Sequence, residues 1–124
     1  MRKRILDFGI LRFPDATESS QLLKTYGEIY EYYNETPFTD LWYFELADVY
    51  IAAVHCFERF GNVFCKFLVE QIEERSDFYT VKGFVERKMD INEQRTWKGD
   101  KHIKKTIKRL NYKTGEITEE IIDA

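Results

Sequence analysis

Apolar residues recur at helical spacing along most of this chain. In residues 18–33 they lie three or four positions apart, and the same spacing returns in 62–78 and 80–96. Residues 41–60 are apolar at 15 of 20 positions, which is typical of a helix that is buried on most of its sides. The pattern therefore predicts four helices, with 41–60 at the centre.

Residues that stop or cap a helix stand between these segments. Asn34 and Pro37 end the first helix, and Thr39 or Asp40 is a suitable N-cap for the second. Gly61 ends the second helix, because glycine readily adopts the left-handed conformation of a C-cap. The short connections favour antiparallel packing of successive helices.

The two ends of the chain lack this helical pattern. Residues 1–17 are expected to form an irregular or short extended lead. Near the other end the sequence TIKRLNYKTGEITEEI alternates and contains a turn signal, so 99–124 is expected to form a hairpin or a loose tail. The predicted fold is all-α: an antiparallel four-helix bundle over 18–98 with this C-terminal appendage.

Composition excludes several classes of protein. The chain of 124 residues is 16% aromatic and contains two cysteines, which excludes a mainly disordered chain and a disulfide scaffold. No apolar run reaches the roughly 18 residues of a membrane-spanning helix. The N-terminus also lacks the apolar stretch of a signal peptide. We therefore expect a cytoplasmic protein with reduced thiols.

Charge is distributed unevenly along the chain. Residues 15–77 carry 13 acidic and 4 basic side chains, whereas 86–109 carry 9 basic and 4 acidic ones. This asymmetry suits an anionic substrate bound together with a divalent cation, and solvated helix faces give the same pattern. Duplex-DNA binders usually have a pI above ~9, so a pI near 5.5 argues against nucleic acid as the partner.

Two carboxylates interrupt the most apolar stretch of the chain. Glu45 and Asp48 are three residues apart and share a helix face. Burial and mutual repulsion make such a pair costly unless a cation compensates. That cation is either a Lys or Arg of another helix, or Mg²⁺, which takes oxygen ligands. His55 lies on the same stripe, and we expect it to be a hydrogen-bonded core or rim histidine.

A second acidic pair, Glu28 and Glu31, has the same spacing in the first predicted helix. If the first two helices pack antiparallel, the two pairs meet between them. Carboxylates that converge between helices are a common way to hold a divalent metal. A solvated helix face is the alternative explanation of Glu28 and Glu31.

A stripe of basic and amide side chains lies near the end of the last predicted helix. Lys88, Asn92 and Arg95 fall at positions i, i+4 and i+7, and these groups suit phosphate oxygens. Trp97 follows, where it either stacks on a base or closes the end of the bundle. An exposed basic face is the alternative.

Two segments carry a resemblance to a known family. FELADVYIAAVHCFERFG, residues 44–61, is similar to the ExxD helix of the MazG-like all-α nucleoside triphosphate pyrophosphohydrolases. KMDINEQRTW, residues 88–97, resembles the C-terminal signature of the same family. The resemblance implies a helical bundle that assembles as a homodimer or homotetramer. It also implies Mg²⁺-dependent cleavage of a nucleoside triphosphate to a monophosphate and pyrophosphate.

The resemblance further implies roles for individual residues. Mg²⁺ would be held by Glu28, Glu45 and Asp48, and Glu28 or Glu31 would act as the general base. The residues implied to bind substrate are Lys88, Asn92, Arg95 and Trp97.

The first acidic helix departs from the family pattern. With Glu28 as the last acid of the family's EExxE helix, Lys24 and Thr25 stand where the family has two glutamates. An alternative register uses Glu28 and Glu31 as the acidic pair. The departure supports a second hypothesis, a domain that binds nucleotide or a partner without turnover. A third is an unrelated helical interaction module that contacts nucleic acid through residues 98–109.

Overall fold

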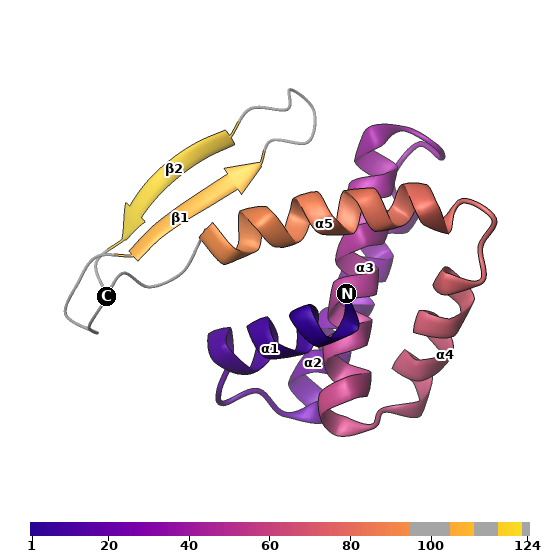
Figure 1. The fold of residues 1–124 in the computed structure, drawn as a ribbon, viewed down its shortest axis with the longest axis horizontal. Helices are drawn as coiled ribbons and strands as arrows, with labels where there is room; N and C mark the ends of the chain where they lie inside the picture. The colour runs from indigo at the N-terminus through magenta and orange to yellow at the C-terminus, as the bar shows by residue number, and fades with distance from the viewer. Residues whose placement is uncertain (95–104, 111–116, 123–124) are drawn as a thin grey trace.

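The computed structural model describes residues 1–94, 105–110 and 117–122 (Figure 1). The first of these ranges is helical, which confirms the all-α class for the main body of the chain. No helix within the described residues has the length and apolar character needed to cross a membrane. The elements are α1 (Arg2–Arg12), α2 (Glu18–Tyr33), α3 (Asp40–Phe60), α4 (Val63–Glu73), α5 (Phe78–Gln94), β1 (Lys105–Leu110) and β2 (Ile117–Ile122).

The helices begin and end at residues with clear capping roles. Thr17 and Ser20 form a reciprocal capping box at the start of α2. Thr39 caps α3 by accepting a hydrogen bond from the backbone N–H of Trp42, as predicted. Gly61 ends α3 with φ of 71°, a conformation that favours glycine, and this also agrees with the sequence.

Helix α3 is the centre of the fold. It packs against α1, α2, α4 and α5, so it contacts each of the other helices of residues 1–94 (Figure 1). Ala47, Ala53 and Val54 are completely buried, and these small side chains let the neighbouring helices approach closely. The apolar character of residues 41–60 follows from this contact on several sides.

The expectation of an irregular lead at the N-terminus is wrong, because α1 is a regular helix. Ile5 and Gly9, one turn apart, are buried against the core. Arg2 forms ion pairs with Glu58 and Glu73. These partners lie far along the chain, so the local sequence pattern gives no sign of the contacts that hold α1.

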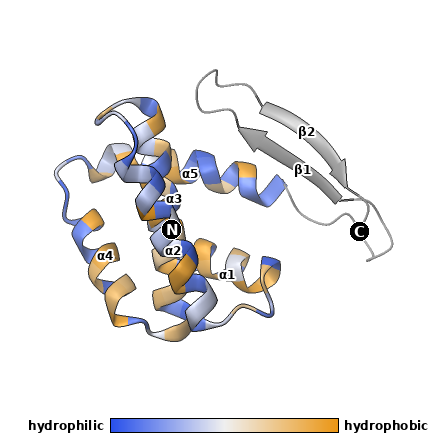
Figure 2. Cartoon of the chain, turned by 180° about the vertical axis from the view of Figure 1, so that it is seen from behind, coloured by the Kyte–Doolittle hydropathy of each residue, from blue (hydrophilic) through white to orange (hydrophobic). Residues whose placement is uncertain are grey.

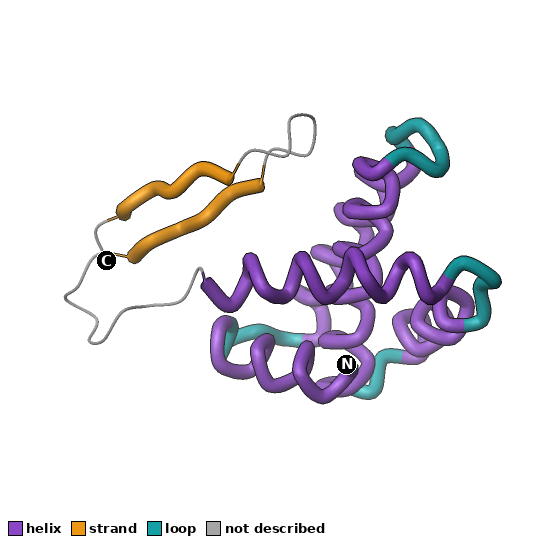
Figure 3. The backbone as a smooth tube through the Cα atoms, turned by 45° about the horizontal axis from the view of Figure 1, so that its top comes forward, coloured by secondary structure: helices purple, strands orange, loops and turns teal. Residues whose placement is uncertain are grey.

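The arrangement also differs from a four-helix bundle, because α1 adds a fifth helix and α5 crosses α3 (Figures 1 and 3). The third predicted helix ends early, at Glu73, where Arg75 and Asp77 form an ion pair within the connection to α5. Beyond α5, β1 and β2 pair antiparallel, with Lys105 opposite Ile122 and Leu110 opposite Ile117. This pairing agrees with the predicted hairpin.

Several large apolar side chains remain exposed on α2 and α4. Helix α4 is mostly apolar (Figure 2), yet Val63 and Phe67 are exposed on it. Tyr26 of α2 lies against Phe64 of α4, with ring centroids 5.4 Å apart, so the two helices share this surface. Such a surface suits the predicted association with a second subunit, which stays a prediction.

Candidate functional site

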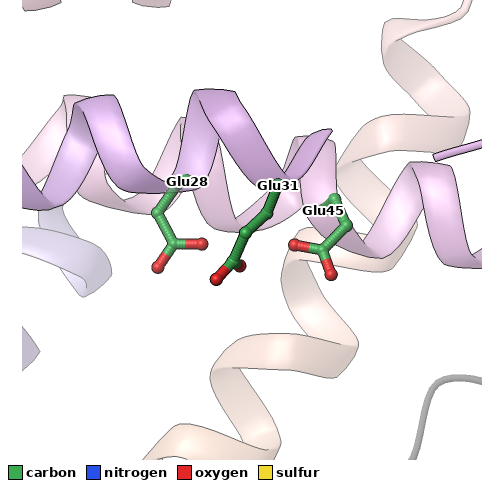
Figure 4. Close-up of side chains that lie close together, drawn as sticks. All are labelled: Glu28, Glu31 and Glu45. Carbon is green, nitrogen blue, oxygen red and sulfur yellow. The ribbon is translucent and has the colours of Figure 1, made fainter. Parts of the chain in front are cut away.

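Three glutamates from two helices lie close together beside α5. Glu28 and Glu31 project from α2, and Glu45 projects from the facing α3 (Figure 4). One carboxylate oxygen from each lies within 4.8 Å of the other two. Three of the four acids predicted from spacing therefore approach one another across the α2–α3 contact, and Asp48 is not part of this group.

The depth of these three carboxylates differs. Glu45 is buried, with 7% of its surface exposed; Glu28 is half-buried and Glu31 is exposed. The Oε2 atoms of Glu28 and Glu45 are buried and have no hydrogen-bond partner among the residues that the structure describes. A buried carboxylate oxygen without a donor is costly, so these two atoms require either a proton or a cation.

Asp48 lies one turn after Glu45, next to the three glutamates, and pairs with a cation of α5. Its Oδ2 atom is 3.4 Å from Nζ of Lys88, and Lys88 is buried with 6% of its surface exposed. The sequence left open whether a basic side chain or Mg²⁺ compensates the buried carboxylates. For Asp48, the compensating cation is a lysine. This ion pair also brings the substrate-binding candidate Lys88 up to the carboxylates.

Burial and mutual repulsion favour the protonated forms of these acids. Burial, followed by the charge of Asp48, raises the pKa of Glu45 to about 8 and that of Glu28 to about 7. Burial also raises the pKa of Asp48 to about 6, although the Lys88 ammonium opposes the shift. At neutral pH without a metal, protons therefore compete with any cation for this site.

These pKa values predict an unusual dependence of stability on pH. The native state holds protons on Glu45 and Glu28 that the unfolded chain has already lost, so its stability falls as pH rises toward 8. His55, whose pKa burial lowers to about 4, acts in the opposite direction only below pH 6.5. In EDTA, unfolding free energy should drop by about 2 kcal/mol between pH 6.5 and 8.

Chemical denaturation across this pH range measures the effect. Saturating Mg²⁺ should remove most of the decline, because the cation replaces the protons. A metal-free protein whose stability is flat or rises from pH 6.5 to 8 would contradict the described protonation of Glu45 and Glu28.

Thr25, which stands where the resemblance would call for a glutamate, is a core residue. It is fully buried, and its Oγ1 atom donates a hydrogen bond to the carbonyl of Gln21 at 2.8 Å. The Sγ atom of Cys65 on α4 lies 3.9 Å from the same oxygen. Thr25 therefore belongs to the packing between α2 and α4.

A variant tests this placement. Thr25→Glu should destabilise the protein by about 2 kcal/mol, because a longer, ionisable side chain enters a closed part of the core. It should not strengthen metal binding. The measurements are chemical denaturation and Mn²⁺ titration, with Ser19→Glu on the exposed start of α2 as control. Tighter Mn²⁺ binding by Thr25→Glu would show instead that position 25 reaches the carboxylates.

Among the other residues singled out in the sequence, the structure places Asn92 and His55. Asn92 is half-buried on α5 and lines a pocket together with Lys88. His55 is buried, and its Nε2 atom is 3.2 Å from a guanidinium nitrogen of Arg59, which confirms a hydrogen-bonded core histidine. Arg95 and Trp97 lie outside the described residues.

The pocket has a volume of about 300 Å³ and lies between α1, α2, α3 and α5. Glu28 and Asp48 reach its edge, so it is continuous with the carboxylate cluster. The sequence did not indicate that α1 forms one side of the pocket, nor that Gln21 of α2 lines it. A lone polar residue on a helix face carries no signal that a fifth helix will cover it.

A search of family models, curated proteins and solved structures finds no match to this chain. The resemblance to MazG-like pyrophosphohydrolases therefore stays a prediction.

Proposed function

We propose that this protein is a Mg²⁺-dependent nucleotide pyrophosphohydrolase, which converts a nucleoside triphosphate to a monophosphate and pyrophosphate. The observation that carries the proposal is that Oε2 of Glu28 and of Glu45 is buried without a hydrogen-bond partner in the described part of the chain, while both carboxylates lie close to that of Glu31. A solvated acidic face would leave these atoms in water. Here they are shielded, and they lie beside a buried lysine that suits phosphate.

The donor set fits magnesium. Every candidate ligand atom is a carboxylate oxygen, which Mg²⁺ prefers. Ligand atoms of one Mg²⁺ lie at most about 4.2 Å apart, because each metal–oxygen distance is about 2.1 Å. Adjacent ligands lie about 3.0 Å apart, so rotations of Glu28, Glu31 and Glu45 would have to draw together oxygens that now lie within 4.8 Å of one another. When bound, the ion would polarise the phosphate and supply the positive charge that the cluster lacks.

The side chains of this chain account for the remaining parts of the reaction. A water oxygen attacks the α-phosphorus, the bond between that phosphorus and the α–β bridging oxygen breaks, and pyrophosphate leaves. A carboxylate oxygen of Glu28 or Glu31 that does not hold the metal would accept the proton of the water. Lys88 stabilises the negative charge that develops on the phosphate oxygens.

Binding without turnover is the second candidate function. The ion pair between Asp48 and Lys88 favours it, because a lysine already neutralises one of the acids expected to hold metal. Lys24 adds a second amine near Glu28 and Asp48, and those two carboxylates partly offset the lowering of its pKa by burial. In this case the site would bind the nucleotide with its metal and release no product.

Product analysis separates the two functions. The purified protein is incubated with each common ribo- and deoxyribonucleoside triphosphate, with Mg²⁺ or with EDTA, and pyrophosphate is measured. We expect release of pyrophosphate and monophosphate with at least one substrate, and only with Mg²⁺. Magnesium-dependent nucleotide binding without products would support the second function instead.

A further inference from the structure

The pocket beside the carboxylates has walls of two different kinds. Phe8 of α1 and Ile51 of α3 provide apolar surface. The cations Arg12, Lys24 and Lys88 line other parts of the pocket together with Asp48, and the Lys24 ammonium lies 4.3 Å from the centre of the Phe13 ring. His55 also lines the pocket. Burial, together with the nearby Arg59 guanidinium, lowers the pKa of His55 to about 4, so its ring is neutral at physiological pH. The pocket therefore offers an apolar surface for an uncharged planar ring beside positive charge that suits phosphate.

Gln21 supplies a specific polar contact in this pocket. The residue is 5% exposed, and its Oε1 atom is buried without a hydrogen-bond partner within residues 1–94, where the side chains are described. A buried carbonyl oxygen of this kind needs an N–H or O–H donor. Phosphate oxygens at neutral pH are mainly acceptors, so they would leave the Gln21 oxygen unsatisfied.

We propose that this pocket binds the base of the nucleotide, with Oε1 of Gln21 accepting a hydrogen bond from a base N–H. The phosphates then extend past Lys88 to the glutamate cluster, since Glu28 lies at the boundary of both. The inference rests on the proposed function in one respect, namely that the ligand is a nucleotide. It requires a base that presents an N–H donor, as all the common bases do on at least one edge.

Gly9 allows α1 to approach His55 closely enough to form one side of the pocket. A Cβ atom at position 9 would lie 2.7 Å from both Cδ2 and Nε2 of His55, which is closer than atoms in contact allow. Helix α1 can therefore lie against His55 only with glycine at this position. Any larger residue must displace the His55 ring or the helix, and both of these form the pocket.

Calorimetric titration of nucleosides into the protein in EDTA tests the inference. Nucleosides carry no phosphate, so their binding does not need the metal site. We expect at least one of uridine, thymidine, cytidine, adenosine and guanosine to bind. Gln21→Leu should weaken that binding tenfold or more, because the N–H of the base loses its acceptor. Leu23→Ala, at an exposed position of the same helix, is the matched control.

Gly9→Ala provides a second variant that leaves Gln21 in place. It should also weaken nucleoside binding, whereas Leu11→Ala on the exposed face of α1 should not. Circular dichroism verifies that each variant is folded. The inference is overturned if folded wild-type protein binds no nucleoside at about 10 mM, a level that detects affinities near −3 kcal/mol. It is overturned equally if both Gln21→Leu and Gly9→Ala bind nucleosides as wild type does.

The two proposals fail in different ways. Nucleoside binding that depends on Gln21, in a protein that releases no pyrophosphate, would keep the base pocket and reject the enzyme. Pyrophosphate release with a KM that is unchanged in Gln21→Leu would keep the enzyme and reject the base pocket.

Discussion

Glu45→Gln should reduce Mg²⁺-dependent pyrophosphate release by about a thousandfold, a loss of roughly 4 kcal/mol of transition-state stabilisation. Glu45 is the most buried of the three glutamates, and its Oε2 atom has no hydrogen-bond partner among the side chains described. The amide has nearly the same shape but no negative charge, so it removes a metal ligand with little change in packing. Steady-state measurement of pyrophosphate release with saturating Mg²⁺ gives the size of the loss.

The same substitution should stabilise the metal-free protein. At pH 8.5 the buried carboxylate of Glu45 is largely ionised, because its pKa is about 8. The neutral amide avoids that charge and should add about 1 kcal/mol to the unfolding free energy in EDTA. Loss of activity together with a gain in stability is a signature that a purely structural residue would not give.

Glu86→Gln is the matched control. Glu86 is exposed on α5, a neighbouring helix, and its substitution removes the same negative charge. It should leave both pyrophosphate release and stability close to wild type. Full activity of Glu45→Gln would contradict the assignment of the metal site, even if the enzyme itself is active.

Lys88→Met should cause the second large effect, on both stability and activity. The lysine is buried and pairs with Asp48 at 3.4 Å, so its removal leaves a shielded carboxylate without that partner. Breaking a buried pair on one side costs about 3 kcal/mol. Pyrophosphate release should fall about a hundredfold, since a positive charge at the phosphates is lost.

Metal binding distinguishes the expected role of Lys88, which is to place a positive charge at the phosphates, from that of Glu45, which is to bind the metal. Removing the Lys88 ammonium lowers the repulsion between the site and a divalent cation, so Mn²⁺ should bind Lys88→Met at least as tightly as wild type. Lys82→Met, on the exposed side of α5, is the control for loss of charge. If Lys88→Met loses Mn²⁺ along with activity, Lys88 acts only by maintaining the structure of the site.

The sequence predicted the centre of the fold well because its signals there are local. The N-cap Thr39 and the C-cap Gly61 each act within one helical turn, and both occur as expected. The approach of Glu28, Glu31 and Glu45 was also predictable, because spacing places them on facing sides of two antiparallel helices.

The parts that the sequence did not predict depend on distant contacts. Helix α1 is held by pairs such as Arg4 with Asp90 and Glu93, whose partners are more than 80 positions away. No local pattern reveals them. The burial of Gln21 was equally unpredictable, because the pocket that it lines is formed partly by residues of α1. The role of Thr25 was misleading for a different reason: a position where the family has a glutamate is here part of the core between α2 and α4.

A divalent-cation site formed by Glu28, Glu31 and Glu45 can be detected by Mn²⁺ titration followed by electron paramagnetic resonance. Free Mn²⁺ gives a strong signal that decreases on binding, so the number of sites is obtained without turnover. Wild type should bind Mn²⁺ at pH 8, Mg²⁺ should displace it, and Glu45→Gln should lose the site while Glu86→Gln keeps it. If folded wild type binds no Mn²⁺, or if Glu45→Gln binds it as wild type does, these three glutamates do not form the site.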